Sequence, residues 1–169
     1  MTDRFPIKNY RLEAGSPLDR ARLVKFMQRA YIDMGTETRG RKNIAHLADT
    51  VERHFSTQSH LWWLIDRRSP PPIGLPGTTR PEPVGCLWLG EAIDQRSGQK
   101  QAYVFLLYVA SGHRRQGLGK ALMTYAQRWA KQQGYGQIGL QVFEDNAPAL
   151  ALYQQMGYAS QARWLSLDL

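Results

Sequence analysis

Residues 103–120 have the sequence YVFLLYVASGHRRQGLGK, and this stretch decides the expected fold. Its first part, Tyr103–Val109, is aromatic and aliphatic without a charge, which is typical of a strand buried on both faces. Gly117 and Gly119 follow, and after them apolar residues recur at helical spacing up to Gly134, a residue suited to a left-handed helix cap. The stretch therefore predicts a strand, a glycine-containing turn and a helix in direct succession.

The turn and a second motif together indicate a site for an anionic ligand. Because Gly117 and Gly119 lack a β-carbon, backbone N–H groups at the helix start can approach a group such as a pyrophosphate. A Gly-x-Gly pair alone is a weak signal, since many such pairs are ordinary turns. Further on, Asn146, Ala149 and Tyr153 fall on another expected helix. Asn146 and Tyr153 would lie on one face of that helix, two turns apart.

These residues resemble the two signatures of the GNAT superfamily of N-acetyltransferases. The first signature is Gln/Arg-x-x-Gly-x-Gly/Ala, and it is met here by Arg114, Gly117 and Gly119. The second is met by Asn146, Ala149 and Tyr153, followed by Gly157-Tyr158 where the family usually has Gly-Phe. The resemblance is strongest over about 103–158, roughly a third of the chain. The N-terminal part is similar only in its order of elements.

The resemblance implies direct transfer of an acetyl group from acetyl-CoA to an amine in a ternary complex. Backbone groups of Leu107, Tyr108 and Val109 would bind the pantetheine arm and orient the thioester carbonyl. Asn146 would contact the cofactor, and Tyr153 would protonate the departing thiolate. The turn implied to bind the pyrophosphate comprises Arg115, Gln116, Gly117, Leu118, Gly119 and Lys120, and Arg114 would also bind the cofactor.

Each of these residues also has a purely structural interpretation. Asn146 precedes Ala147-Pro148 and could be only a helix N-cap. Tyr153 could be a core aromatic, because its neighbours follow core-like helical spacing. Arg114 and Arg115 could belong to a solvated charged turn. The joint pattern favours the functional interpretation, although capping and cofactor contact are compatible roles.

The base that would deprotonate the amine is not evident from the sequence. Tyr103–Val109 contains no carboxylate, and Gln141 stands where a glutamate is common in this family. The remaining candidates are Glu144, Asp145, His46 and His54. A site without a strong base favours an acceptor with a low-pKa amine, although a small amine and a protein amine both stay open as acceptor classes.

Length and composition favour one catalytic domain over 1–169. A chain of 169 residues with 43% hydrophobic residues can bury a single core. No stretch has the length of a membrane span or the pattern of a secretory signal. Cys86 is the one cysteine, so no intrachain disulfide forms, and no Cys/His cluster predicts a metal. A cytoplasmic location is therefore expected.

The net charge of +8 is concentrated around the expected turn. No Asp or Glu occurs in 95–143, whereas seven basic residues do: Arg96, Lys100, Arg114, Arg115, Lys120, Arg128 and Lys131. A basic field suits polyanionic coenzyme A. The alternatives are a catalytically silent acyl-CoA-binding sensor and a basic nucleic-acid-binding module, the latter disfavoured because no nucleic-acid-binding signature accompanies the charge.

The resemblance and the periodicities predict an α/β (α+β) GNAT fold, in which a mixed, mostly antiparallel sheet is flanked by helices in the order β-α-α-β-β-β-α-β-α-β. The segment 69–83 holds six of the nine prolines and is expected to be an irregular loop. A second subunit could cover an edge left unpaired by the short C-terminal region, so a homodimer is an open alternative. The expected elements are strands at Ile7–Ala14, Leu61–Ile65, Val84–Leu89, Tyr103–Val109, Ile138–Val142 and within Tyr158–Leu169, and helices carrying Leu23 to Met34, Ile44 to Phe55, Leu118 to Trp129 and Asn146 to Met156.

Overall fold

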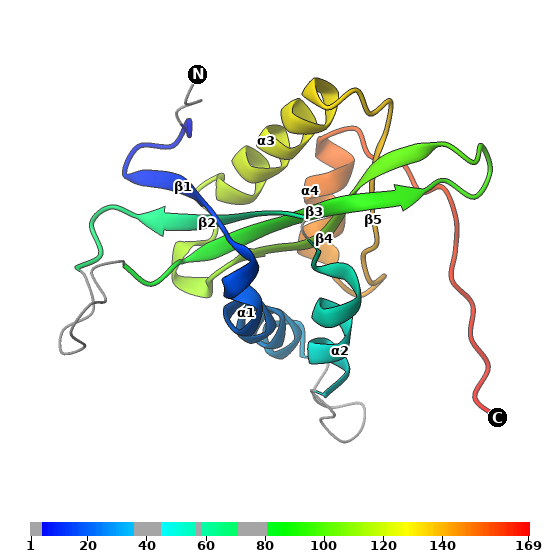
Figure 1. Cartoon of the computed structure of the whole chain (residues 1–169), viewed down its shortest axis with the longest axis horizontal. Helices are drawn as coiled ribbons and strands as arrows, with labels where there is room; N and C mark the ends of the chain where they lie inside the picture. Colours follow the sequence, from blue (N-terminus) through cyan, green and yellow to red (C-terminus); the bar gives the residue numbers. More distant parts are fainter. Residues whose placement is uncertain (1–4, 36–44, 57–58, 71–80) are drawn as a thin grey trace.

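A computed structural model describes residues 5–35, 45–56, 59–70 and 81–169 (Figure 1). Its strands form one five-stranded sheet in the order β1-β2-β3-β4-β5. The strands are β1 (Tyr10–Ala14), β2 (His60–Asp66), β3 (Gly85–Ile93), β4 (Lys100–Val109) and β5 (Ile138–Leu140). The helices are α1 (Arg20–Asp33), α2 (Ala45–His54), α3 (Leu118–Gln132) and α4 (Ala147–Gln155).

The sheet is mixed and mostly antiparallel, as predicted. Neighbouring strands from β1 to β4 run antiparallel, and β5 pairs parallel to β4. A parallel pair needs a crossover connection, and α3 supplies it between β4 and β5. The predicted α/β class is therefore confirmed.

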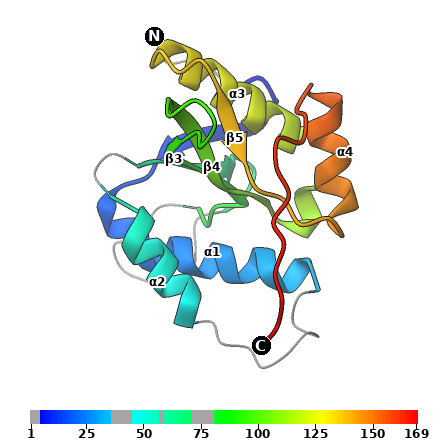
Figure 2. The same ribbon diagram turned by 90° about the vertical axis from the view of Figure 1, so that its right-hand side faces the viewer.

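The helices cover both faces of the sheet and give it two apolar cores (Figure 2). On one face, α1 and α2 contribute Leu23, Phe26 and Leu47 to a core that includes Trp88 of β3. On the other face, α3 packs Leu122 against the sheet, with α4 alongside. The burial of these large side chains supplies the main driving force that holds the layers together.

A β-bulge changes the path of β4 at Phe105. Trp88 of β3 pairs with Leu106, whereas the next residue, Leu89, pairs with Val104, so Phe105 is the extra residue. A bulge bends the strand and increases its twist. Beyond this point β4 continues to Val109, but its pairing with β5 ends at Val104. The second half of β4 therefore has an open edge on the β5 side.

The open edge corrects one prediction about Tyr103–Val109. The sequence predicted a strand buried on both faces, yet only Val104 and Tyr108 are buried within this segment, and its other residues are partly exposed. The physical reason is that β5 is short and leaves β4 after three residue pairs. The chain thus keeps an apolar strand accessible where a buried one was expected.

The closing strand predicted within Tyr158–Leu169 is also wrong. This segment follows α4 as an extended tail without strand pairing (Figure 1). Its apolar side chains point to solvent, with Trp164 84% and Leu165 88% exposed. A strand forms only where a partner supplies its hydrogen bonds, and the tail finds none along the described sheet.

Other boundaries differ slightly from the predictions. The first strand begins at Tyr10 instead of Ile7, because Asn9 adopts a left-handed φ of 70° that interrupts an extended chain. Ile44 and most of the proline-rich segment lie outside the described residues. Cys86 is fully buried in β3. Within the described ranges, no helix combines the length and apolar character needed to cross a membrane.

Candidate active site

The turn between β4 and α3 has an unusual backbone. Arg115 and Gly117 both adopt left-handed conformations, with φ of 63° and 76°. Alternating backbone conformations of this kind direct successive N–H groups toward one side and form a concave nest. α3 then starts at Leu118, where the first N–H groups have no partner within the helix and carry the positive end of its dipole. This part of the chain offers several donors to one anion.

The two signature glycines differ in what requires them. Gly117 is the N-cap of α3 and adopts a left-handed conformation. This conformation is energetically unfavourable for a residue with a β-carbon, so the position requires glycine. A β-carbon at Gly119 would instead lie 3.3 Å from Cδ2 of Leu152 on α4. Gly119 therefore also serves the close packing of α3 against α4, a role that sequence inspection did not assign to it.

Arg114 is held by an acidic residue that sequence reasoning missed. Its guanidinium forms an ion pair with Asp33, the last residue of α1, and its Nε donates to the carbonyl oxygen of Val109 at 2.8 Å. The Tyr108 hydroxyl donates to Oδ2 of the same Asp33 at 3.1 Å. Burial, helped by Asp33, raises the pKa of Tyr108. A carboxylate therefore reaches the end of β4 from a helix instead of from a strand.

One sequence signal could have pointed to Asp33. An acidic residue in the last turn of a helix interacts unfavourably with the helix dipole, so its presence there suggests a tertiary partner. The partners, Tyr108 and Arg114, are 75 and 81 residues away in the chain. Only the fold brings the three together.

Asn146 caps α4 and also contacts α1. Its side-chain oxygen accepts from the N–H of Ala149 at 3.3 Å, and its Nδ2 lies 3.5 Å from Sδ of Met34. Pro148 occupies the first turn of the helix. The N-cap interpretation of Asn146 is thus confirmed, and its amide lies beside the end of α1 near Asp33.

Tyr153 lies on α4 and packs against the core that α3 and the sheet share. Its ring centroid is 5.7 Å from that of Tyr158. Burial, with a smaller contribution from Tyr158, raises the pKa of Tyr153 to about 12. The phenol is therefore protonated near neutral pH, which is the state that a proton donor requires.

The four candidate bases occupy different places around the site. Glu144 and Asp145 are exposed in the turn between β5 and α4. His46 is exposed on α2, with its ring 5.8 Å from that of Tyr31 on α1. His54 lies at the end of α2, where its ring is 5.1 Å from that of Phe105. None of the four is buried.

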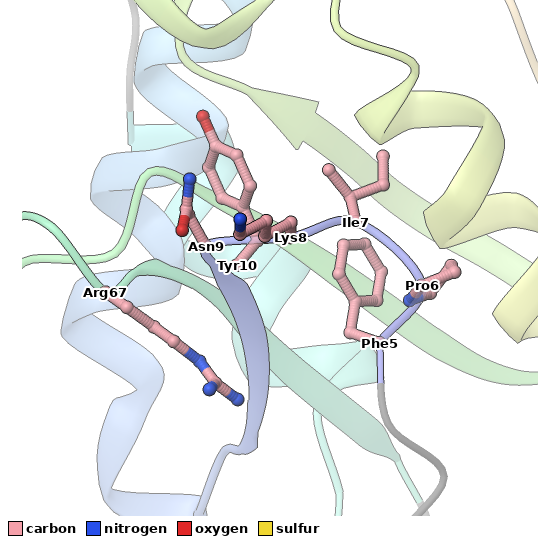
Figure 3. Close-up of a pocket in the computed structure, with 7 residues that line it drawn as sticks. All are labelled: Phe5, Pro6, Ile7, Lys8, Asn9, Tyr10 and Arg67. Carbon is pink, nitrogen blue, oxygen red and sulfur yellow. The ribbon is translucent and has the colours of Figure 1, made fainter.

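A cavity of about 370 Å³ lies beside the N-terminal segment (Figure 3). It contains none of the residues predicted to bind the cofactor. Ile7 on its wall would be 3.8 Å from a β-carbon at Gly117, so the cavity lies near the turn. Its lining residues are Phe5, Pro6, Ile7, Lys8, Asn9, Tyr10 and Arg67.

The basic residues of 95–143 are not all near the turn. Lys100 pairs with Glu91 at 2.8 Å, and Arg96 hydrogen-bonds Gln161 at 3.3 Å, both around the β3–β4 hairpin. Arg114, Arg115 and Lys120 are the basic residues of the turn itself. In the part of the chain that the structure describes, no group of three or more His, Cys, Asp or Glu side chains could hold a metal ion.

The fold and the turn define the class of protein. The model of the acetyltransferase (GNAT) family matches residues 35–158, more than half of the chain, so the chain belongs to this family. It is 34% identical over 86 residues to human N-acetyltransferase 8, an alignment that covers 43% of this chain and 38% of the human protein. The chain spans less than half the length of the curated relatives that it matches.

Solved structures share the fold at lower sequence identity. A putative acetyl transferase from Pyrococcus furiosus superposes with a TM-score of 0.71 at 22% identity, covering 95% of this chain and 99% of that one. A predicted acetyltransferase from Clostridium acetobutylicum, solved with acetyl-CoA, gives a TM-score of 0.69 at 15% identity, covering 94% and 96%. At these identities the similarity shows the fold alone.

Proposed function

We propose that this chain is an N-acetyltransferase that moves an acetyl group from acetyl-CoA directly to a primary amine. The observation that carries the proposal is that three structural features follow one another around the site. The open edge of β4 leads into a left-handed turn, the turn leads into the N-terminus of α3, and α4, which packs against α3, carries the protonated Tyr153. Membership of the acetyltransferase family supports the same conclusion.

The residues fit coenzyme A in two places. The backbone of Leu107, Tyr108 and Val109 is not paired with β5, which suits the extended pantetheine arm, although the Val109 carbonyl already accepts a hydrogen bond from Arg114. The turn from Arg114 to Lys120 suits the pyrophosphate, because its N–H groups and basic side chains complement a double negative charge. Bound acetyl-CoA supplies an activated acyl carbon and a thiolate leaving group.

The chain's own groups then have separate tasks. Strand N–H groups near Val109 stabilise negative charge on the carbonyl oxygen as the amine attacks. The Tyr153 hydroxyl gives its proton to the departing sulfur, and water takes up the proton that the amine nitrogen loses and returns one to Tyr153. Asn146 holds the start of α4 against α1 through its cap and its contact with Met34, which orients the helix that carries Tyr153.

The acceptor is an amine that is already partly neutral near pH 7.5. A lysine-type amine has a pKa of about 10.4, so roughly one molecule in a thousand is neutral, whereas an α-amine has a pKa of about 7.7–8.0. The described candidates for a base are all solvent-accessible, and Asp33 is neutralised by Arg114. A site without a dedicated base to deprotonate the amine works best on an amine of low pKa.

The test is acetyl transfer from acetyl-CoA to a panel of small amines and peptides, followed by release of the free thiol. We expect turnover with at least one amine, and faster turnover with α-amines than with lysine-type amines of matched size. Binding of acetyl-CoA without turnover on any acceptor would support the silent sensor. Tighter binding to a DNA fragment than to coenzyme A would support the nucleic-acid module, and no binding of coenzyme A would refute the enzyme.

A further inference from the structure

Asp66 is the one buried charged residue among those that the structure describes, with 4% of its surface exposed. It ends β2, and Arg68 binds both of its oxygens, with Nε 2.9 Å from Oδ1 and a terminal nitrogen 2.8 Å from Oδ2. The backbone N–H of Arg68 also donates to Oδ1 at 2.9 Å. His113 brings its Nδ1 within 3.8 Å of Oδ2. A buried carboxylate persists only with such partners.

The hydroxyl of Tyr10 links this carboxylate to the turn after β4. Tyr10 is 3% exposed, and its oxygen lies 2.9 Å from Nδ1 of His113 and 3.1 Å from Oε1 of Gln116. A terminal nitrogen of Arg68 donates to the same oxygen at 3.2 Å. Tyr10 thus joins the start of β1 and the end of β2 to two residues of the turn.

Counting protons assigns the direction of these bonds. A phenol has one proton to donate, and Arg68 can only donate. If Tyr10 donates its proton to Oε1 of Gln116, then Nδ1 of His113 must carry a proton and donate to the Tyr10 oxygen. The nearby Asp66 carboxylate favours that tautomer, because it attracts the same Nδ1 proton. Each of the three hydrogen bonds at the Tyr10 oxygen then has one donor and one acceptor.

The turn needs such support because its backbone is unfavourable by itself. Arg115 has a left-handed φ of 63° although it has a β-carbon, and it stands between His113 and Gly117. A conformation of this kind is unfavourable for a residue with a β-carbon and persists only when the surroundings impose it. His113 and Gln116 flank Arg115 on both sides, and both are fixed by the Tyr10 hydroxyl.

We propose that Tyr10 is a positioning residue for the pyrophosphate of the cofactor. Its hydroxyl holds the His113–Gly117 turn in the conformation that directs N–H groups toward the anion. Arg68 donates to this hydroxyl, and Asp66 lies beside His113, so the two residues keep the hydroxyl and the imidazole in place. This inference rests on the proposed function, because it assigns the turn to coenzyme A.

The test is the variant Tyr10→Phe, which keeps the buried ring and removes only the hydroxyl. The dissociation constant for coenzyme A, measured by calorimetry, should rise about tenfold. This is the loss of affinity expected when a hydroxyl that holds the turn through hydrogen bonds is removed. The KM for acetyl-CoA should rise similarly, with kcat at saturation unchanged. Amide hydrogen exchange in 111–119 should be faster without ligand, whereas exchange in β2 and β3 should not change.

Tyr135→Phe is the matched control. It also removes a hydroxyl hydrogen bond, to Glu91 at 3.0 Å, but near the β3–β4 hairpin instead of the turn. Its affinity for coenzyme A should equal that of the wild type. His113→Phe should reproduce the effect of Tyr10→Phe, and the double variant should be no weaker than the weaker single variant, because both act through one network.

The outcomes separate this inference from the proposed function. If the wild type does not bind coenzyme A, the proposed function fails and the inference fails with it. If the wild type binds and both Tyr10→Phe and His113→Phe bind within twofold of it, the inference alone is wrong. Should Tyr10→Phe fail to fold, His113→Phe decides by the same measurements.

Discussion

The chemistry of Tyr153 depends on its surroundings more than on its place in a motif. Because burial raises its pKa to about 12, the hydroxyl keeps its proton through any practical assay pH. Tyr153→Phe removes that proton donor and should lower kcat about 100-fold, the lower end of the usual contribution of general acid catalysis. The KM for acetyl-CoA should change much less, because the ring remains.

Tyr158→Phe is the control for this prediction. Its ring lies next to Tyr153, and its hydroxyl only accepts a hydrogen bond from Gln127 at 3.4 Å. Steady-state kinetics with a validated acceptor should give a kcat close to that of the wild type. Full turnover in Tyr153→Phe would show that Tyr153 is structural.

The pH dependence of the rate tests whether the chain has a dedicated base. If the acceptor supplies its own neutral amine, kcat/KM should rise with pH and level off near the pKa of that amine. The same profile should appear in Asp33→Asn and Glu144→Gln. A plateau above an apparent pKa near 6–7, lost in one of these variants or in a His46 or His54 variant, would identify a base and contradict the expected acceptor.

Among the elements, β1, β2 and the turn after β4 are joined by one hydrogen-bond network, in which Asp66 carries the buried charge. The side-chain hydrogen bond from Arg68 is the main reason why the pKa of Asp66 is lowered in the folded chain. A lowered folded pKa stabilises the fold above the unfolded value of about 3.9, and this stabilisation is lost as the pH falls through the folded pKa. Asp66 is thus a stabilising charge at neutral pH.

Asp66→Asn should therefore reduce the free energy of unfolding at pH 7 by about 1–3 kcal/mol, the usual contribution of hydrogen bonds to a charged group. The difference from the wild type should shrink as the pH falls from about 4 toward the lowered folded pKa, because the carboxyl is protonated first in the unfolded chain and then in the folded one. Urea unfolding at several pH values measures this. Asp49→Asn, at an exposed site on α2, should show no such difference, and an equally stable Asp66→Asn would contradict the prediction.

At the scale of the whole molecule, the net charge of +8 should increase the affinity for the polyanionic coenzyme A. Salt screens interactions between exposed charges over a Debye length of about 10 Å at 0.1 M. Calorimetric affinity for coenzyme A should therefore fall steadily as NaCl is raised. Lys120→Gln, at the turn, should weaken binding and flatten the salt dependence.

Lys100→Gln provides the comparison, because it removes the same charge at the β3–β4 hairpin, where Lys100 already pairs with Glu91. Its salt dependence should match that of the wild type. Equal effects of the two substitutions would mean that net charge, and not the turn, attracts the ligand.

Short sequence patterns were sufficient to predict the separate elements and the two motifs. The apolar run at Tyr103–Val109, the glycine turn and the helical spacing after Leu118 each depend on neighbours within a few residues, so the pattern was sufficient to predict them. The Asn146 cap belongs to the same class, since its partner is the N–H of Ala149. The two family signatures, at 114–119 and 146–153, are equally local, because each lies within one turn or one helix.

How residues from distant parts of the chain complete the site depends on the fold. Asp33 contacts Tyr108 and Arg114 because the end of α1 lies beside the end of β4. Tyr10 contacts His113, 103 residues away in the chain, because β1 and the turn meet at one end of the sheet. The missing closing strand and the open edge of β4 have the same origin. A strand forms only beside a partner, and whether that partner is there depends on sheet register and bulges, which no short sequence pattern specifies.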